Sequence, residues 1–434
     1  MSAPGLILNV AVLGLGMHLG GWRKREGSPF DYLDISYYQE IGRIAERGKL
    51  HAVFLADTLA VAEENFERPN LGALDPAVTL SAVAAATTHV GLVATASTTY
   101  NEPYNLARRT SSLDHISGGR AAWNIVTTFV PDVAANFGDQ LLPPGPERYE
   151  RAEEFVDVVL ALWDSWKDGA LIGDKAHGRF VDRSKVAPID HKGRYYTVRG
   201  PLTLPRSPQG RPILFQAGSS EEGRRLAARV ADAVFTVHST TESAQAYYAD
   251  MKARAVSFGR APDAIKILPG IVPVLGSTVE EARRRKDELD ALAGDAELRK
   301  LALRVGVKVG DLDLDKPLPL DLVAANAGFR ASEGFRSAAV ELARQKHLTV
   351  RQIVYENGGG HIQVVGTPEQ VADKIEEWYR AKAADGFNLM IDTLPSSLGD
   401  FVDTVVPILQ KRGVFRTDFT GTTLRSNLGL EGLQ

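Results

Sequence analysis

The 434-residue sequence contains no cysteine. Disulfide bonds, thiolate nucleophiles and zinc or iron–sulfur centres with cysteine ligands are therefore excluded. An excess of either charge is also lacking, since 50 basic and 54 acidic residues leave a formal net charge of −4. This balance gives no indication of nucleic-acid or membrane binding. No apolar run is long enough to span a bilayer, and the apolar start lacks the basic residues of a signal peptide. We expect a soluble, cytoplasmic protein with a large core, because 44% of the residues are hydrophobic.

A glycine-rich segment, Gly14 to Gly20, follows the first apolar run and resembles a dinucleotide-binding loop only in part. Its third glycine comes one position too late for the G-x-G-x-x-G pattern, and no helix opens after it. A loop at the end of a barrel strand fits better, with His18 and Trp22 facing a pocket. For His18, a polar loop position without a role is an equally good interpretation.

Eight short apolar runs alternate with amphipathic segments, and this alternation predicts a single-domain α/β protein, a (β/α)8 barrel of TIM type spanning residues 1–434. Long irregular insertions follow the fourth and seventh strands, at about residues 167–211 and 294–363, and segments of this kind often form lids or walls. The tail at residues 413–434 is predicted to be an extended arm that reaches a neighbouring subunit. The predicted strands are Gly5–Leu13, Ala52–Ala56, Val90–Ala96, Ala121–Val126, Pro212–Gln216, Ala233–Val237, Ile265–Val272 and Phe387–Ile391.

Polar residues stand at the carboxyl ends of several predicted strands, where barrel enzymes carry their chemistry. Asp57 follows the second strand, and Asn124 lies near the end of the fourth. A carboxylate such as Asp57 can also simply cap the turn that follows a strand. Ser219 and Ser220 follow the fifth strand and open a helix, which is a plausible cradle for a phosphate. An ordinary N-cap made by serine, with Glu222 as its partner, explains the same residues equally well.

Several strings in one order resemble the flavin-dependent monooxygenases of the nitrilotriacetate and dibenzothiophene-sulfone type, within the bacterial-luciferase-like superfamily. The most specific is LDHISGGRAAWNIVTT (113–128), a helix end, a glycine turn and a strand. The resemblance covers nearly the whole chain. The other strings are ERGKLHAVFLAD (46–57), TASTTYNEPYNLAR (95–108), RYERAEEF (148–155), RGPLTLPRSPQGRPILFQAGSS (199–220), VGTPEQVAD (365–373) and RGVFRTDFTGTTLRSNLGL (412–430).

The resemblance implies an FMNH2-dependent monooxygenase on one TIM-like barrel, supplied with FMNH2 by a separate NADH:FMN reductase and using dioxygen as cosubstrate. It places Asp57, Thr95, Tyr149 and Ser220 at flavin contacts, and Ser219 with Ser220 at the FMN phosphate. Thr95 and Asn124 match the positions that hold dioxygen beside the flavin. Relatives are dimers or tetramers, so a homodimer or homotetramer is expected. Relatives also carry a histidine where this chain has Gly145; His361 or His18 could take its place.

These inferences lead us to expect oxygenation of a small organic substrate, with cleavage of a C–N or C–S bond. We expect no metal site, no nucleic acid and no membrane as partners. Two alternatives remain open: a deazaflavin-dependent oxidoreductase on the same fold, and a flavin-binding protein without catalytic activity.

Overall fold

Eight parallel strands form the centre of the computed structural model, which describes residues 5–61, 74–128, 130–138, 141–326, 329, 332–357, 360–430 and 432. Each strand overlaps one of the predicted apolar runs. Each also pairs with the next along the chain, and the last pairs with the first, so the predicted (β/α)8 barrel is confirmed. The strands are β1 (Ile7–Val12), β2 (Ala52–Leu55), β3 (Gly91–Ser97), β4 (Ala121–Val126), β9 (Ile213–Gln216), β10 (Ala233–Thr236), β11 (Lys266–Leu275) and β13 (Gly386–Leu389).

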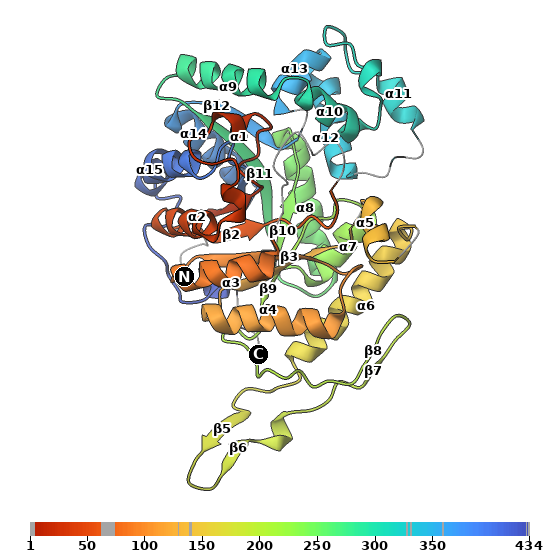
Figure 1. Cartoon of the computed structure of the whole chain (residues 1–434), viewed down its shortest axis with the longest axis vertical. Helices are drawn as coiled ribbons and strands as arrows, with labels where there is room; N and C mark the ends of the chain where they lie inside the picture. The colour runs from red at the N-terminus through yellow and green to blue at the C-terminus, as the bar shows by residue number, and fades with distance from the viewer. Residues whose placement is uncertain are drawn as a thin grey trace.

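Helices follow the strands and cover the outside of the barrel (Figure 1). The glycine turn after α4 (Pro103–Ser117) has the conformation that the sequence predicts, since Gly118 ends the helix with a φ of 67°. Within the described ranges no helix has both the length and the apolar composition that a bilayer crossing requires. The covering helices are α2 (Ile35–Arg47), α3 (Pro76–Ala86), α4 (Pro103–Ser117), α6 (Gly145–Trp163), α7 (Glu221–Val230), α8 (Thr241–Ser257), α14 (Pro368–Arg380) and α15 (Ser396–Lys411).

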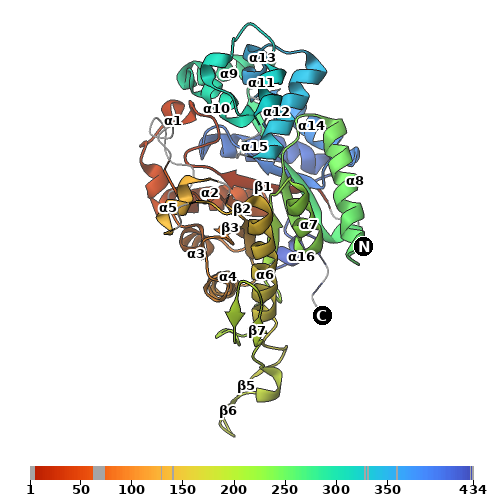
Figure 2. The same cartoon turned by 90° about the vertical axis from the view of Figure 1, so that its right-hand side faces the viewer.

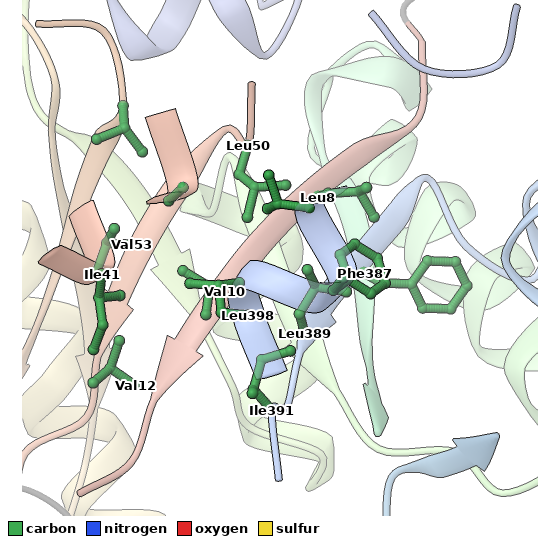
Figure 3. Packing of buried hydrophobic residues seen from close by; sticks show 14 of the residues in the cluster. Leu8, Val10, Val12, Ile41, Leu50, Val53, Phe387, Leu389, Ile391 and Leu398 are labelled. Carbon is green, nitrogen blue, oxygen red and sulfur yellow. The ribbon is translucent and has the colours of Figure 1, made fainter. Parts of the chain in front are cut away.

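The largest hydrophobic cluster lies between the outer face of the barrel and its helices. Side chains alternate along a strand, so every second residue of β1 and β13 points outward. Leu8 and Val10 of β1 lie beside Leu389 of β13 and Leu398 of α15 (Figure 3). Each is fully buried, and burying a leucine side chain contributes about 1.5–3 kcal/mol. This packing fixes β1 and β13 as neighbours and thereby closes the barrel.

The second insertion forms a helical cap with its own small hydrophobic cluster, which includes Leu301, Leu342 and Ile353. It consists of α10 (Ala296–Val305), α11 (Leu320–Ala325), α12 (Glu333–Lys346) and α13 (Val350–Tyr355), after α9 (Val279–Ala293). It ends in a strand that the sequence did not predict, β12 (Ile362–Gly366), which pairs with the extended end of β11.

The carboxyl ends of the strands form the mouth of the barrel. Both insertions are predicted to form walls around this mouth, but the first insertion does not. It contains two hairpins, β5 (Leu171–Asp174) with β6 (Arg179–Val181), and β7 (His191–Lys192) with β8 (Thr197–Val198). Figures 1 and 2 show β5 and β6 at the end of the molecule opposite to α10–α13. The physical reason is topological: the insertion follows α6, which runs back from the mouth toward the start of β9.

The tail folds onto its own barrel and does not extend as the predicted arm. The tail contains a short helix, α16 (Leu424–Asn427), which begins at Leu424 and is followed by Leu428. Both leucines are buried inside the barrel with Ile7, Ala52 and Val93. The Leu424 N–H donates to the Gly119 carbonyl at 2.9 Å. Since these residues lie at the starts of the strands, the tail plugs the amino-terminal end. The barrel is therefore open for chemistry at its carboxyl end.

Candidate active site

Thr95 and Asn124 form the best-defined polar pair at the carboxyl end of the barrel. They face each other in the register of β3 and β4, and Asn124 faces Phe215 of β9 on its other side. Asn124 Nδ2 donates to Thr95 Oγ1 at 3.0 Å. Both side chains are buried, yet Asn124 Oδ1 has no hydrogen-bond partner among the described residues. A buried polar atom without a partner costs about 1–3 kcal/mol, so the pair is suited to receive a ligand.

Asp57 follows β2 at the same end and is half-buried. Burial, followed by the nearby Asp75 carboxylate, raises the pKa of Asp57 to about 6. A carboxyl group with this pKa can donate or accept a proton near neutral pH.

Tyr149 of α6 reaches the turn between β9 and α7, which contains Ser219 and Ser220. A Cβ at Gly218 or at Gly223 would lie 2.7 or 2.8 Å from Tyr149 Oη, so the two glycines make room for this hydroxyl. Ser220 Oγ accepts from the Gly223 N–H at 3.2 Å and caps α7. The N-cap interpretation is thus confirmed, although its partner is not Glu222 in the described contacts. This cap does not compete with a phosphate cradle, because the Tyr149 hydroxyl lies at the same helix start; the Ser219 hydroxyl lies beside Gly334 of α12.

The electrostatics of this turn combine both signs. Glu221 stands in the first turn of α7, but its carboxylate is paired with Arg254 at 2.6 and 3.0 Å. Arg224 Nε donates to the Ser219 carbonyl at 3.0 Å, which brings a guanidinium to the turn. The acidic helix start is therefore balanced by arginines.

His361 lies inside the mouth, directly before β12. Its ring stacks on Phe235 of β10, with centroids 5.2 Å apart and an interplanar angle of 13°, and meets Phe335 of α12 edge-on. Burial, followed by the nearby charges of Arg304 and Lys300, lowers the pKa of His361 to about 3. The ring is thus neutral at physiological pH, and its Nδ1 has no hydrogen-bond partner in the described part of the chain.

A series of aromatic rings joins His361 to the strand beside Asn124. Phe54 meets Phe215 at 5.8 Å and Phe235 at 5.7 Å, both edge-on. Phe215 faces Asn124 in the sheet register, and Phe235 carries His361. The structure therefore brings His361 and the Thr95–Asn124 pair to one aromatic-lined end of the barrel.

His18, in contrast, is occupied by contacts that hold its loop in place. The Gly20 N–H donates to Nδ1 at 3.1 Å, and Nε2 lies 3.0 Å from Asp290 Oδ1 of α9. Because Nδ1 accepts a hydrogen bond, Nε2 carries the proton and donates it to Asp290. Both ring nitrogens are thus engaged, and the geometry favours a positioning role for His18.

Sequence reasoning missed a polar cavity of about 290 Å³ beside Ser219, between β10, α8 and α12. His238 and Thr236 line it, and burial, followed by the Arg224 charge, lowers the pKa of His238 to about 4. Thr236 ends β10, so the polar strand end was a signal that could have found it. No group of three or more metal-ligating side chains occurs among the residues described.

The comparisons with known proteins agree with this geometry. A family model described as "Luciferase-like monooxygenase" matches residues 15–385. Two curated proteins are each 44% identical to this chain: N-acetyl-S-(2-succino)cysteine monooxygenase of Bacillus subtilis, with 98% of this chain and 96% of that protein covered, and nitrilotriacetate monooxygenase component A of Aminobacter aminovorans, with 96% and 94% covered. Among solved structures, a riboflavin lyase with modified FMN and riboflavin has a TM-score of 0.85 at 34% identity, covering 99% of this chain and 96% of that one.

Proposed function

Because this chain belongs to the luciferase-like monooxygenase family and is an oxidoreductase, we propose that it is the oxygenase component of a two-component system that uses FMNH2 and dioxygen. The single observation that carries the proposal is the buried Thr95–Asn124 pair with its unpartnered amide oxygen. Bound FMNH2 would supply the two electrons with which one oxygen atom of O2 enters the substrate while the other leaves as water.

The residues present fit an FMN ligand. The Tyr149 and Ser219 hydroxyls and the start of α7 would hold the phosphate, as helix starts commonly do. Asn124 would orient the ring system and the oxygen beside it. His361, neutral and stacked on Phe235, closes the mouth on the side of the helical cap. The cap would exclude water from the reacting groups, as the second insertion was expected to do.

The names of the relatives support a substrate class and a partner. N-acetyl-S-(2-succino)cysteine and nitrilotriacetate are small organic carboxylates, one a thioether and the other an amine. We infer a carboxylate-bearing thioether or amine as substrate here, with oxygenation next to sulfur or nitrogen and cleavage of the C–S or C–N bond. The word "component" in one name implies a second protein, for which an NADH:FMN reductase is the natural candidate.

The test replaces Asn124 with alanine. Anaerobic protein with FMNH2 is mixed with oxygenated buffer and followed by flavin absorbance. Wild type should reoxidise the flavin at a rate different from that of free FMNH2. Asn124→Ala should still bind FMN, but with nitrilotriacetate or N-acetyl-S-(2-succino)cysteine added as the substrate, its product formation, measured by mass spectrometry, should fall by about 10²-fold or more, the scale of one lost charge-stabilising hydrogen bond.

The matched control is Gln245→Ala, which removes an exposed amide on α8. It should behave as wild type. Unchanged product formation in Asn124→Ala would refute the role of the pair. Reoxidation by wild type at the rate of free FMNH2 would refute the proposed function itself.

A further inference from the structure

A second cavity, of about 800 Å³, lies at the carboxyl end of the barrel but outside the site described above. The loop after β1 forms one side together with α1 (Gly21–Lys24), a short helix where the sequence predicted none. The end of α9, α10 and the segment up to Val309 form the other. The volume falls in the range of small-molecule sites.

Most of the residues in the walls of this cavity are apolar. Trp22 and Leu19 come from the loop after β1, and Leu303 and Val309 from the helical cap. Leu303 is 59% exposed and Val309 39% exposed, so apolar surface stands open to solvent here. An exposed apolar surface inside a concave site indicates a ligand with an apolar part.

The charged side chains that line the cavity are all basic: Arg23, Arg299, Lys300 and Lys308. Arg23 is fixed, because its Nη1 donates to the Leu292 carbonyl at 2.8 Å. Lys300 is paired with Glu297 at 2.7 Å, so its charge is partly balanced. The rim provided by Arg23 and Lys308 therefore gives the cavity a positive potential that suits a carboxylate.

Side chains of α10 link this cavity to the segment that holds His361, since Lys300 Nζ donates to Asn357 Oδ1 at 3.4 Å. Lys300 lines the cavity, and Arg304, one turn further along α10, donates to the carbonyl of Asn357. The amide of Asn357 in turn donates to the His361 carbonyl at 3.2 Å. The cavity is thus connected to the mouth of the barrel through Lys300 and Asn357.

We propose that this cavity binds a small amphipathic carboxylate and so selects the substrate class of the enzyme, with Arg23 and Lys308 recognising the carboxylate and Trp22 and Leu303 the apolar part. The inference rests on the proposed function, since it names the residues that recognise the substrate. It adds a recognition site that lies apart from the flavin contacts.

The test is calorimetric titration of the flavin-free full chain with naphthalene-2-carboxylate, and with the neutral 2-naphthalenemethanol as a probe of nearly the same size. Wild type should bind the acid at least tenfold more tightly than the alcohol. The Arg23→Gln/Lys308→Gln double variant should bring the two affinities within threefold of each other. Leu303→Asp, at an exposed position, should weaken the binding of naphthalene-2-carboxylate by at least tenfold. Arg43→Gln, on the exposed face of α2, is the control and should change neither value.

Equal binding of acid and alcohol by wild type would overturn the proposal, as would unchanged affinities in the double variant and in Leu303→Asp. The titration needs neither flavin nor oxygen. Charge-selective binding by a chain that fails the stopped-flow test would therefore refute the proposed function alone. Turnover without charge-selective binding would refute the cavity assignment alone.

Discussion

The position of His361 depends on a glycine in the neighbouring strand, and this dependence gives a quantitative prediction. Gly270 of β11 faces the imidazole ring so closely that a Cβ there would lie 2.5 Å from Cγ and 2.8 Å from Cε1 of His361, and closer still to Nδ1. The Gly270→Ala variant must therefore displace the ring from Phe235. Overpacking of this kind costs about 1–3 kcal/mol in unfolding free energy.

Gly270→Ala should raise the unfolding free energy, and not lower it, when the imidazole ring of His361 is removed. In a His361→Ala background the methyl group at 270 meets no imidazole. Replacing a glycine by alanine where the backbone permits it stabilises a protein by about 0.4–1 kcal/mol, since the unfolded chain loses freedom. The coupling energy between the two positions should therefore be about 1.5–4 kcal/mol, the sum of the two effects.

The assay is urea unfolding of the two single variants and the double variant, followed by tryptophan fluorescence. Gly399→Ala is the matched control, because a Cβ on this glycine of α15 meets no atom within 4 Å. Gly399→Ala should raise the unfolding free energy by about 0.5–1 kcal/mol both in wild type and in His361→Ala, as expected for a helical glycine replaced by alanine. A coupling energy near zero between positions 270 and 361 would refute the claim that Gly270 makes room for His361.

Two further outcomes are expected. Tyr149→Phe should weaken FMN binding about 10- to 100-fold, because a hydrogen bond to a charged group contributes about 1.5–3 kcal/mol. Riboflavin, which has no phosphate, should bind equally to wild type and Tyr149→Phe in fluorescence titrations. An equal loss of affinity for FMN and for riboflavin would contradict the phosphate cradle. Asp57 has a pKa raised from 3.8 to about 6, so its neutral form is favoured in the folded state. Wild-type stability should therefore fall relative to Asp57→Asn as the pH rises from about 4 to about 7, in urea unfolding at each pH. A constant difference between the two proteins would contradict the raised pKa.

The strands of the barrel were predictable because each is a short apolar run whose polar end marks the mouth. Thr95 and Asn124 share a register that follows from adjacent parallel strands. The family resemblance, confirmed by relatives at 44% identity, implies flavin contacts for Tyr149 and Ser219, and the structure brings the Tyr149 hydroxyl to the turn that contains Ser219. The relatives, named as monooxygenases, favour the oxygenase over the deazaflavin-dependent and non-catalytic alternatives.

The two histidine candidates show where sequence reasoning stopped. His18 and His361 both follow or precede a strand near the mouth, and nothing in their local sequence separates them. Contacts with distant residues distinguish the two histidines. Asp290 engages His18, whereas Phe235 and Gly270 contact His361 in the mouth. Such contacts join residues more than 90 positions apart, and no local pattern encodes them.

The sequence by itself thus determined the barrel, its order of strands and the polar residues at their ends, since these follow from local periodicity and neighbouring strand pairs. Tertiary structure alone decided three features. It placed the first insertion away from the mouth, because α6 runs back along the barrel. It turned the tail into a plug, because Leu424 and Leu428 pack against Ile7, Ala52 and Val93 near the strand starts. It also made His361 a neutral, stacked ring, because burial in the mouth removes the water that would stabilise its charge.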